Sequence, residues 1–379
     1  MNIELKKSLL AGEYTPFMKK SILNKGNQAR IAKVLQKALS GEDITVVTIG
    51  GSITSGAWAT SDENKYAVRV KNWFVEHFPN ITVNFQNAGI SATPSLIGVH
   101  RVAEQVLSFD PDFVVVDFTV NDTANDETYK VPYENLVRRI LMHKTEPAVL
   151  SVVFGSVNKE KKRNDNALSL HLPTIMHYNI PAIDYFGSLW EYIDSGVISW
   201  DDVAADSVHP NNNGHLMAAN CINYFLDSVL CDLDNINTND YVLPKAFIFG
   251  SGAFMNAIFL KSDNYNPYLL ENFISDNLHA DKGDRILGWS CNEKGGTIVF
   301  NIKNLNNVSV FIQKASGNAT ADIYINDKLV LSDVSGDAPS DKVVRFCYTE
   351  FFDEPCNAIV KIVAKGKFGV GPLGVSFAE

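Results

Sequence analysis

The chain has 379 residues, of which 46% are hydrophobic and 20% are charged, and its formal net charge is −10. This composition is typical of a folded globular protein, and the length is sufficient for two domains with separate cores. The negative charge argues against nucleic acid or an anionic membrane as the main partner.

Residues 1–7 lead into no sustained apolar segment and no small-residue cleavage site. No stretch approaches the roughly 18 consecutive apolar residues of a membrane-spanning helix. We therefore expect no secretory signal and no membrane span, and we predict a cytoplasmic protein. The cysteines form an odd, scattered set without a CxxC pair, which we interpret as reduced thiols. They are Cys221, Cys231, Cys291, Cys347 and Cys356.

Helical and strand patterns alternate along the first part of the chain. Residues 28–40 carry apolar side chains at helical spacing, and further helical patterns lie at 65–78, 95–109 and 213–229. Short apolar runs that we predict to be strands lie at 44–49, 81–86, 113–119, 147–154 and 180–183. The Val-rich runs lack in/out alternation, as expected of strands buried on both faces. Residues 1–232 are therefore predicted to form an α/β domain built on a doubly wound parallel sheet.

The spacing of apolar residues changes after an Asn/Asp-rich stretch at 233–240, which we predict to be a linker. Apolar residues now alternate with others, as at Ile298, Phe300 and Ile302, which is the period of a half-buried strand. Asn326-Asp327 separates two such runs and predicts a hairpin turn. Residues 241–379 are therefore predicted to form an accessory domain, a jelly-roll-like antiparallel β-sandwich.

Candidate chemistry lies where the predicted parallel strands end, because ligands bind at the carboxyl edge of such sheets. The first strand breaks at two glycines followed by Ser52, and the second runs into Asn87-Ala88-Gly89. The third runs into Val120-Asn121-Asp122, and Asp206-Ser207-Val208-His209-Pro210 precedes the last helix. We expect these four segments to converge on one edge of the sheet.

A serine hydroxyl needs a base to take its proton, and histidine is the usual base. Asp206 lies three residues before His209 and can fix the tautomer of the imidazole and stabilise its charged form. The tetrahedral intermediate also needs hydrogen-bond donors for its oxyanion. The candidates are the N–H groups of Ser52 and Gly89 and the side-chain amide of Asn121.

These four blocks, in this order and spacing, resemble the SGNH hydrolase family, also called GDSL-like hydrolases, over roughly residues 30–230. The resemblance implies a flavodoxin-like fold, Ser52 as nucleophile, Asp206 and His209 as the rest of a triad, and Gly89 and Asn121 in the oxyanion hole. It also implies that neither a metal nor an organic cofactor is required. Two positions depart from the family pattern: Gly51 replaces the usual Asp, and Thr119 replaces a frequent glycine. The Gly-Gly-Ser-Ile-Thr variant joined to a β-sandwich is similar to two-domain carbohydrate O-acetylesterases such as acetylxylan esterases.

Other interpretations of these residues were weighed. Ser52 taken alone could be a turn serine that caps a helix. A phosphate loop is excluded, because Ala57-Trp58 stand where the required Lys and Ser/Thr would follow Gly56. A metal site at Asp206, His209 and His215 has no supporting motif such as HExxH. Trp58 could line a sugar-facing rim or belong to the core.

The sequence therefore predicts a serine esterase that removes acetyl or other short acyl groups from carbohydrate, such as imported xylan-derived oligosaccharides. Two alternatives stay open: a lipolytic esterase or thioesterase with the same triad, and a non-catalytic carbohydrate-binding protein. The predicted partner is a small acylated carbohydrate, with no nucleic acid and no membrane, and a homo-oligomer is left open. The second domain could bind sugar, shape the active site or mediate that oligomer.

Overall fold

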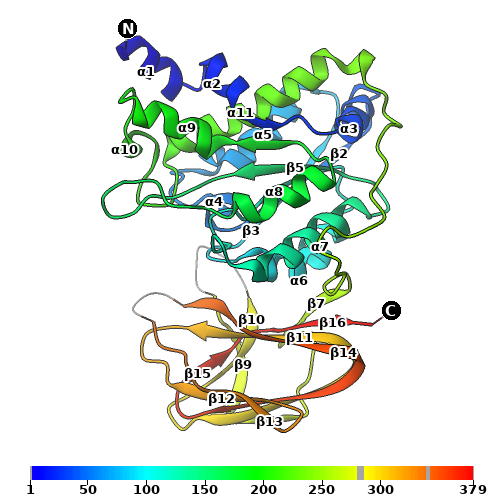
Figure 1. Cartoon of the computed structure of the whole chain (residues 1–379), viewed down its shortest axis with the longest axis vertical. Coiled ribbons are helices and arrows are strands. Elements are labelled where there is room, and N and C mark those ends of the chain that lie inside the picture. The colour runs from blue at the N-terminus through cyan, green and yellow to red at the C-terminus, as the bar shows by residue number, and fades with distance from the viewer. Residues whose placement is uncertain (1, 280–285, 339–341, 379) are drawn as a thin grey trace. The chain divides into compact units, whose positions relative to one another are not determined.

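The computed structural model describes residues 2–279, 286–338 and 342–378 (Figure 1). The chain divides into two compact units. The first contains residues 1–90 and 102–251, and the second contains residues 91–101 and 252–379. Within the described residues, no helix is both long and apolar enough to cross a bilayer. The domain limits predicted from the sequence, at 232 and 241, stay a prediction.

A six-stranded sheet forms the centre of the first unit. Five strands run parallel: β2 (Ile44–Gly50), β3 (Val83–Gly89), β4 (Phe113–Asp117), β5 (Ala148–Val153) and β6 (Ala182–Asp184). Strand β1 (Ile22–Asn24), which the sequence analysis did not predict, pairs antiparallel with β6 at one edge. The order is β1-β6-β5-β4-β2-β3, so the direction of the strand order reverses at β2. This is the flavodoxin-like arrangement, in which ligands bind beyond the carboxyl ends of the strands at the reversal.

Helices cover both faces of this sheet (Figure 1). The predicted helices are α3 (Ala29–Leu39), α5 (Tyr66–His77), α6 (Ser95–Gln105) and α11 (Asn212–Cys231). The remaining helices are α1 (Asn2–Leu10), α2 (Thr15–Lys20), α4 (Ser52–Ser55), α7 (Lys130–Leu141), α8 (Leu168–His177), α9 (Tyr185–Asp194) and α10 (Trp200–Val203). Short 3₁₀ turns occur at 62–64, 107–109, 127–129 and 233–235.

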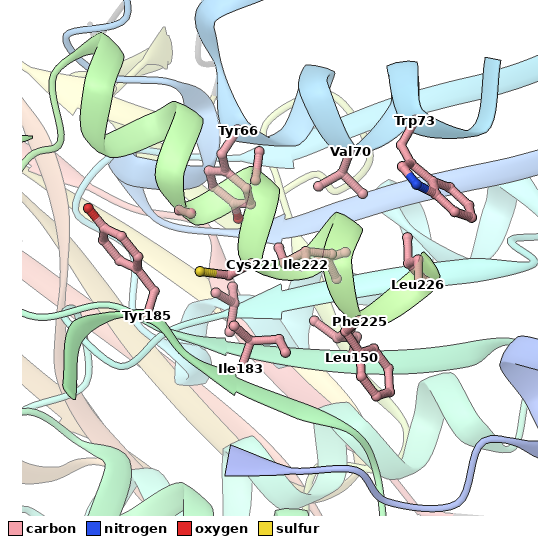
Figure 2. Packing of buried hydrophobic residues seen from close by; sticks show 14 of the residues in the cluster. Tyr66, Val70, Trp73, Leu150, Ile183, Tyr185, Cys221, Ile222, Phe225 and Leu226 are labelled. Carbon is pink, nitrogen blue, oxygen red and sulfur yellow. The ribbon is translucent and has the colours of Figure 1, made fainter. Parts of the chain in front are cut away.

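The core of the first unit lies between the sheet and helices α3, α5, α9 and α11. Val70 of α5 and Phe225 of α11 are fully buried members of this cluster, and Phe225 lies beside Leu150 of β5 (Figure 2). Trp73 packs at the same face, and its indole N–H donates to Asp227 Oδ1 over 2.8 Å. The apolar helical stripes read from the sequence are therefore the faces that bury against the sheet.

The second unit is built from antiparallel strands. Two of them are long, β11 (Gly296–Lys314) and β14 (Val343–Ala364), and they pair along most of their length. The others are β7 (Ala257–Leu260), β8 (Leu269–Glu271), β9 (Phe273–Asn277), β10 (Leu287–Cys291), β12 (Thr320–Ile325), β13 (Lys328–Ser335), β15 (Phe368–Val370) and β16 (Leu373–Phe377). The predicted fold class, a doubly wound parallel sheet followed by an antiparallel β-sandwich, is confirmed.

Two local sequence patterns in the second unit predict its structure correctly. Ile298, Phe300 and Ile302 are buried on β11, in agreement with their alternation. Asn326 and Asp327 join β12 to β13, and both have positive φ, at 49° and 63°. Two consecutive left-handed residues are what a tight type I′ hairpin requires.

The segment 91–101, which follows β3, belongs to the second unit rather than the first. Its His100 is 2% exposed, and its ring lies 5.3–5.7 Å from the rings of Phe254, Phe259 and Phe311. Arg345 of β14 donates a hydrogen bond to the carbonyl of Ala92, whose backbone is left-handed at φ 58°. Helical periodicity at 95–109 predicted the whole of α6 (Ser95–Gln105), but it did not indicate which core residues 95–101 pack against.

Candidate active site

The carboxyl ends of β2, β3 and β4 lie side by side. In the pairing register, Gly50 stands opposite Gly89 on one side and Asp117 on the other. Ser52 begins the short helix α4 immediately after β2, and Asn121 lies in the loop that follows β4. The predicted convergence of the strand-end blocks on one edge follows from this register.

Ser52, His209 and Asp206 form one continuous hydrogen-bond chain. Ser52 Oγ lies 2.8 Å from His209 Nε2, and His209 Nδ1 lies 2.8 Å from Asp206 Oδ2. Ser52 is 9% exposed. A carboxylate can only accept a hydrogen bond, so His209 Nδ1 carries the hydrogen and Nε2 is the acceptor for the serine hydroxyl. This is the arrangement of a nucleophile, its base and the group that orients the base.

The loop that carries Asp206 and His209 is held in place by its own backbone. Ala205 N–H donates to His209 O over 2.9 Å, and the indole of Trp200 donates to Asp206 O over 2.7 Å. The second carboxylate oxygen of Asp206 accepts from the N–H groups of Val208 and His209, each at 2.7 Å. Burial by itself would raise the pKa of Asp206, but the bonds from His209 and Val208 outweigh it and lower that pKa. Asp206 is therefore held as the charged carboxylate that the triad needs.

Asn121 lies against Gly51, the residue just before Ser52. A β-carbon built on Gly51 would collide with the side-chain amide of Asn121, mainly with its oxygen. Gly51 has φ −89° and ψ −149°, so its φ lies outside the left-handed region that favours glycine, and the close approach of Asn121 is a steric reason for a glycine here. Gly51 departs from the family pattern, and the sequence alone did not indicate this reason.

Gly89 ends β3 and packs directly against α4. A β-carbon there would collide with Ser55 N and with the carbonyl carbon of Thr54. The N–H of Gly89 donates to Asn87 Oδ1 over 2.9 Å, and Asn87 Nδ2 donates to Thr54 O over 2.8 Å. Asn87 therefore connects β3 to α4, the helix that begins at Ser52. The sequence did not indicate this role, although Asn87 opens the Asn-Ala-Gly block.

A buried polar network lies under the same strand ends. Thr54 Oγ1 donates to Asp117 Oδ2 over 3.1 Å and lies 2.8 Å from the hydroxyl of Tyr66. Burial, with a smaller contribution from the charge of Asp122, raises the pKa of Asp117 to about 7 against the hydrogen bonds from Thr54 and Thr119. The hydrogen bond from Thr54 to Asp117 thus anchors α4 two residues past Ser52.

Asp122, next to Asn121 in sequence, forms a second buried pair. Its Oδ2 lies 2.7 Å from His171 Nε2, and both side chains have no exposed surface. The ring of Tyr133 stacks on His171 with ring centres 3.6 Å apart. The sequence analysis did not single out His171 or Tyr133, because nothing local to either residue indicates the pair.

The other carboxylates and imidazoles near the triad have structural partners. Asp201 pairs with Lys161, whereas Asp202 pairs with Lys6 and forms a capping box with Ser199. His215 Nδ1 accepts from Tyr66 N–H and its Nε2 donates to Ala57 O. Across the described parts of the chain, no group of three or more His, Cys, Asp or Glu residues is placed to hold a metal ion.

Residues 48–217 match the model of the GDSL-like lipase/acylhydrolase family. A search of curated proteins finds no match. Among solved structures, the chain is similar to a two-domain esterase active on acetylated mannans, co-crystallised with mannopentaose, at 27% identity and a TM-score of 0.80. That match covers 96% of this chain and 98% of the other. A second structure of such an esterase matches at 26% identity with a TM-score of 0.78, covering 96% of this chain and 99% of that one.

Proposed function

We propose that this chain, a carboxylic ester hydrolase of the GDSL-like acylhydrolase family through its residues 48–217, removes acetyl groups from acetylated oligosaccharides with Ser52 as nucleophile. The observation that carries the proposal is the unbroken hydrogen-bond chain from Ser52 Oγ through His209 to Asp206 at the carboxyl edge of the sheet. The likeness of both units together to an esterase active on acetylated mannans supports fragments of acetylated mannan as substrates. Xylan-derived oligosaccharides are the second candidate.

The first half-reaction transfers the acetyl group to the protein. His209 Nε2 takes the hydroxyl proton as Ser52 Oγ bonds to the ester carbonyl carbon, and the carbonyl oxygen becomes an oxyanion. When the tetrahedral intermediate collapses, the carbon–oxygen bond to the sugar breaks and His209 gives its proton to the departing sugar oxygen. Asp206 orients the imidazole throughout and stabilises its charged form while the tetrahedral intermediate exists.

The second half-reaction releases acetate. A water molecule attacks the carbonyl carbon of the acetyl-serine while His209 takes one of its protons. Collapse of the second tetrahedral intermediate breaks the bond to Ser52 Oγ, which recovers its hydrogen from His209. The products are acetic acid, ionised at neutral pH, and the free enzyme.

We propose that two hydrogen-bond donors hold the oxyanion. These are the N–H of Ser52 and the amide of Asn121, whose oxygen faces Gly51. Gly89 N–H, the third predicted donor, would have to share its hydrogen with Asn87 Oδ1. Preorganised donors of this kind typically contribute about 100- to 1000-fold each to the rate.

Acetate release from acetylated mannan and xylan oligosaccharides, measured for the full chain and for Ser52→Ala, tests the proposal. We expect Ser52→Ala to lose activity by roughly a million-fold, as for other serine nucleophiles. Ser40→Ala, at the exposed end of α3, is the matched control and should keep full activity. Substantial turnover by Ser52→Ala, or a preference for long acyl chains in a p-nitrophenyl ester series, would contradict the proposal.

A further inference from the structure

Trp58 exposes its indole from an unusual backbone conformation. Its side chain is 55% exposed, although tryptophan buries more apolar surface than almost any other residue when it joins a core. Its φ is +64°, in the left-handed region that bulky residues rarely adopt. Strained backbone of this kind persists only where surrounding contacts enforce it, and such positions gather at functional sites.

Those contacts connect the segment 57–60 to both sides of the triad. On one side, Ala57 N–H donates to the carbonyl of Ser52 over 2.9 Å. On the other, Thr60 N–H donates to Asn212 Oδ1 over 3.0 Å, and Asn212 Nδ2 donates to Thr60 Oγ1 over 2.8 Å. Asn212 begins α11, three residues after His209. Trp58 therefore lies on a short bridge between the nucleophile and the helix that follows the base.

His215 also holds the segment 57–60 in place. Its ring accepts from Tyr66 N–H at Nδ1 and donates from Nε2 to the carbonyl of Ala57 over 3.1 Å. Burial lowers the pKa of His215 to about 4, against the opposing effect of its bond to Ala57. The ring of His215 is therefore neutral near neutral pH. It keeps this tautomer and its bond to Ala57 at the pH values where a serine esterase is active.

An exposed indole at this position suits a flat, partly apolar ligand. One face of a pyranose ring presents C–H groups, and these pack on the electron-rich face of an aromatic ring while the hydroxyl groups stay hydrated. The tryptophans buried elsewhere in this unit differ, because Trp73 and Trp200 are almost fully covered and their N–H groups bond to protein oxygens.

We propose that Trp58 is the stacking platform for a pyranose ring of the substrate, next to the triad. This inference rests on the proposed function and narrows it: the ester must sit on a sugar ring, and recognition of that ring is separable from ester cleavage. Small esters without a sugar ring reach Ser52 without using Trp58. Oligosaccharide esters need it for binding.

The test compares two substrates in three variants. We expect Trp58→Ala to lower kcat/KM on acetylated mannan oligosaccharides about tenfold, mainly through KM, because an aromatic stacking contact is worth about one power of ten. Activity on p-nitrophenyl acetate should change less than twofold. Trp58→Phe, which keeps a ring, should recover most of the loss. Phe109→Ala removes a 45% exposed aromatic before the amino end of β4 and is the matched control, expected to change neither activity.

A further variant, Trp58→Gly, controls for misfolding at this position. It also deletes the indole, but glycine adopts positive φ without strain, so we expect this variant to fold normally. Mannopentaose should inhibit hydrolysis of p-nitrophenyl acetate by the unaltered chain about ten times more strongly than hydrolysis by Trp58→Gly. An equal loss of kcat/KM on both substrates, or no loss on the oligosaccharide, would contradict the role of Trp58 as a stacking platform. Neither result would contradict the proposed function, which the activity of Ser52→Ala tests separately.

Discussion

The side-chain amide of Asn121 occupies the space that a β-carbon on Gly51 would need. The two residues are 70 positions apart in sequence, and the pairing of β2 with β4 brings them together. The missing side chain at Gly51 thus leaves room for the amide of Asn121 next to the residue that precedes Ser52.

Gly51→Ala should therefore impair catalysis without unfolding the chain. The added methyl group displaces the Asn121 amide, and we expect kcat to fall about 100- to 1000-fold, the usual effect of losing one oxyanion donor. Steady-state kinetics on p-nitrophenyl acetate measure this. In the Asn121→Ala background the same substitution should cost little, because its target is already gone. Fully additive losses would show that Gly51 acts by another route.

Asp206→Asn should be almost inactive although it preserves shape. The two backbone N–H groups at 2.7 Å require an acceptor at one position, so the amide oxygen takes it and the NH₂ group faces His209 Nδ1. His209 then carries its hydrogen on Nε2 and cannot accept from Ser52. We expect kcat to fall about 10⁴-fold, as for the same change in another triad. A loss below tenfold, at unchanged thermal stability, would contradict this assignment of the tautomer.

Asp117→Asn should change how stability depends on pH. The pKa of Asp117 is about 7 in the folded chain against 3.8 for a free aspartate, so the folded state binds this proton more tightly than the unfolded state. The stabilisation that this bound proton gives the folded state is therefore fully present below about pH 4 and is lost as pH rises through 7. Asn cannot ionise, so the variant should gain stability relative to the unaltered chain between pH 5 and pH 8. Urea unfolding at these two pH values measures the change, and parallel curves would refute it.

His171→Leu should destabilise the first unit by about 1–3 kcal/mol, because it removes the hydrogen bond between His171 and the buried carboxylate of Asp122. Adding Asp122→Asn should cost less in this background than in the unaltered chain, because the bond to His171 is already gone. Chemical unfolding of the two single variants and the double variant measures the coupling. A double variant as unstable as the sum of the two single variants would show that Asp122 and His171 do not stabilise each other.

The meeting of Ser52, His209 and Asp206 could be predicted from the sequence because these residues are close in sequence or follow strand ends. Asp206 and His209 are three residues apart, and Ser52 follows directly from the Gly-Gly break after an apolar strand. Parallel strands with buried faces must place their carboxyl ends at one edge, so convergence followed from the fold class alone. The hairpin at Asn326-Asp327 is likewise a local property of two residues that tolerate positive φ.

The remaining features depend on distances that no local pattern encodes. The contact of Asn121 with Gly51 follows from strand register, and the pKa of Asp117 follows from complete burial. The bond from Gly89 N–H to Asn87 depends on one side-chain rotamer. The pairing of His171 with Asp122 joins residues 49 positions apart. The sequence contains each of these residues, but only the folded chain brings them together.

The assignment of residues 91–101 to the second unit bears on how this architecture could arise and be engineered. Domain shuffling moves contiguous stretches of a gene, and a cut near residue 251 would separate this segment from Phe254, Phe259, Phe311 and Arg345. The second unit is therefore not one contiguous stretch of the chain, and removing residues 252–379 would take away the partners of residues 91–101. A design that exchanges residues 252–379 for another domain must supply new partners for His100 and for the carbonyl of Ala92.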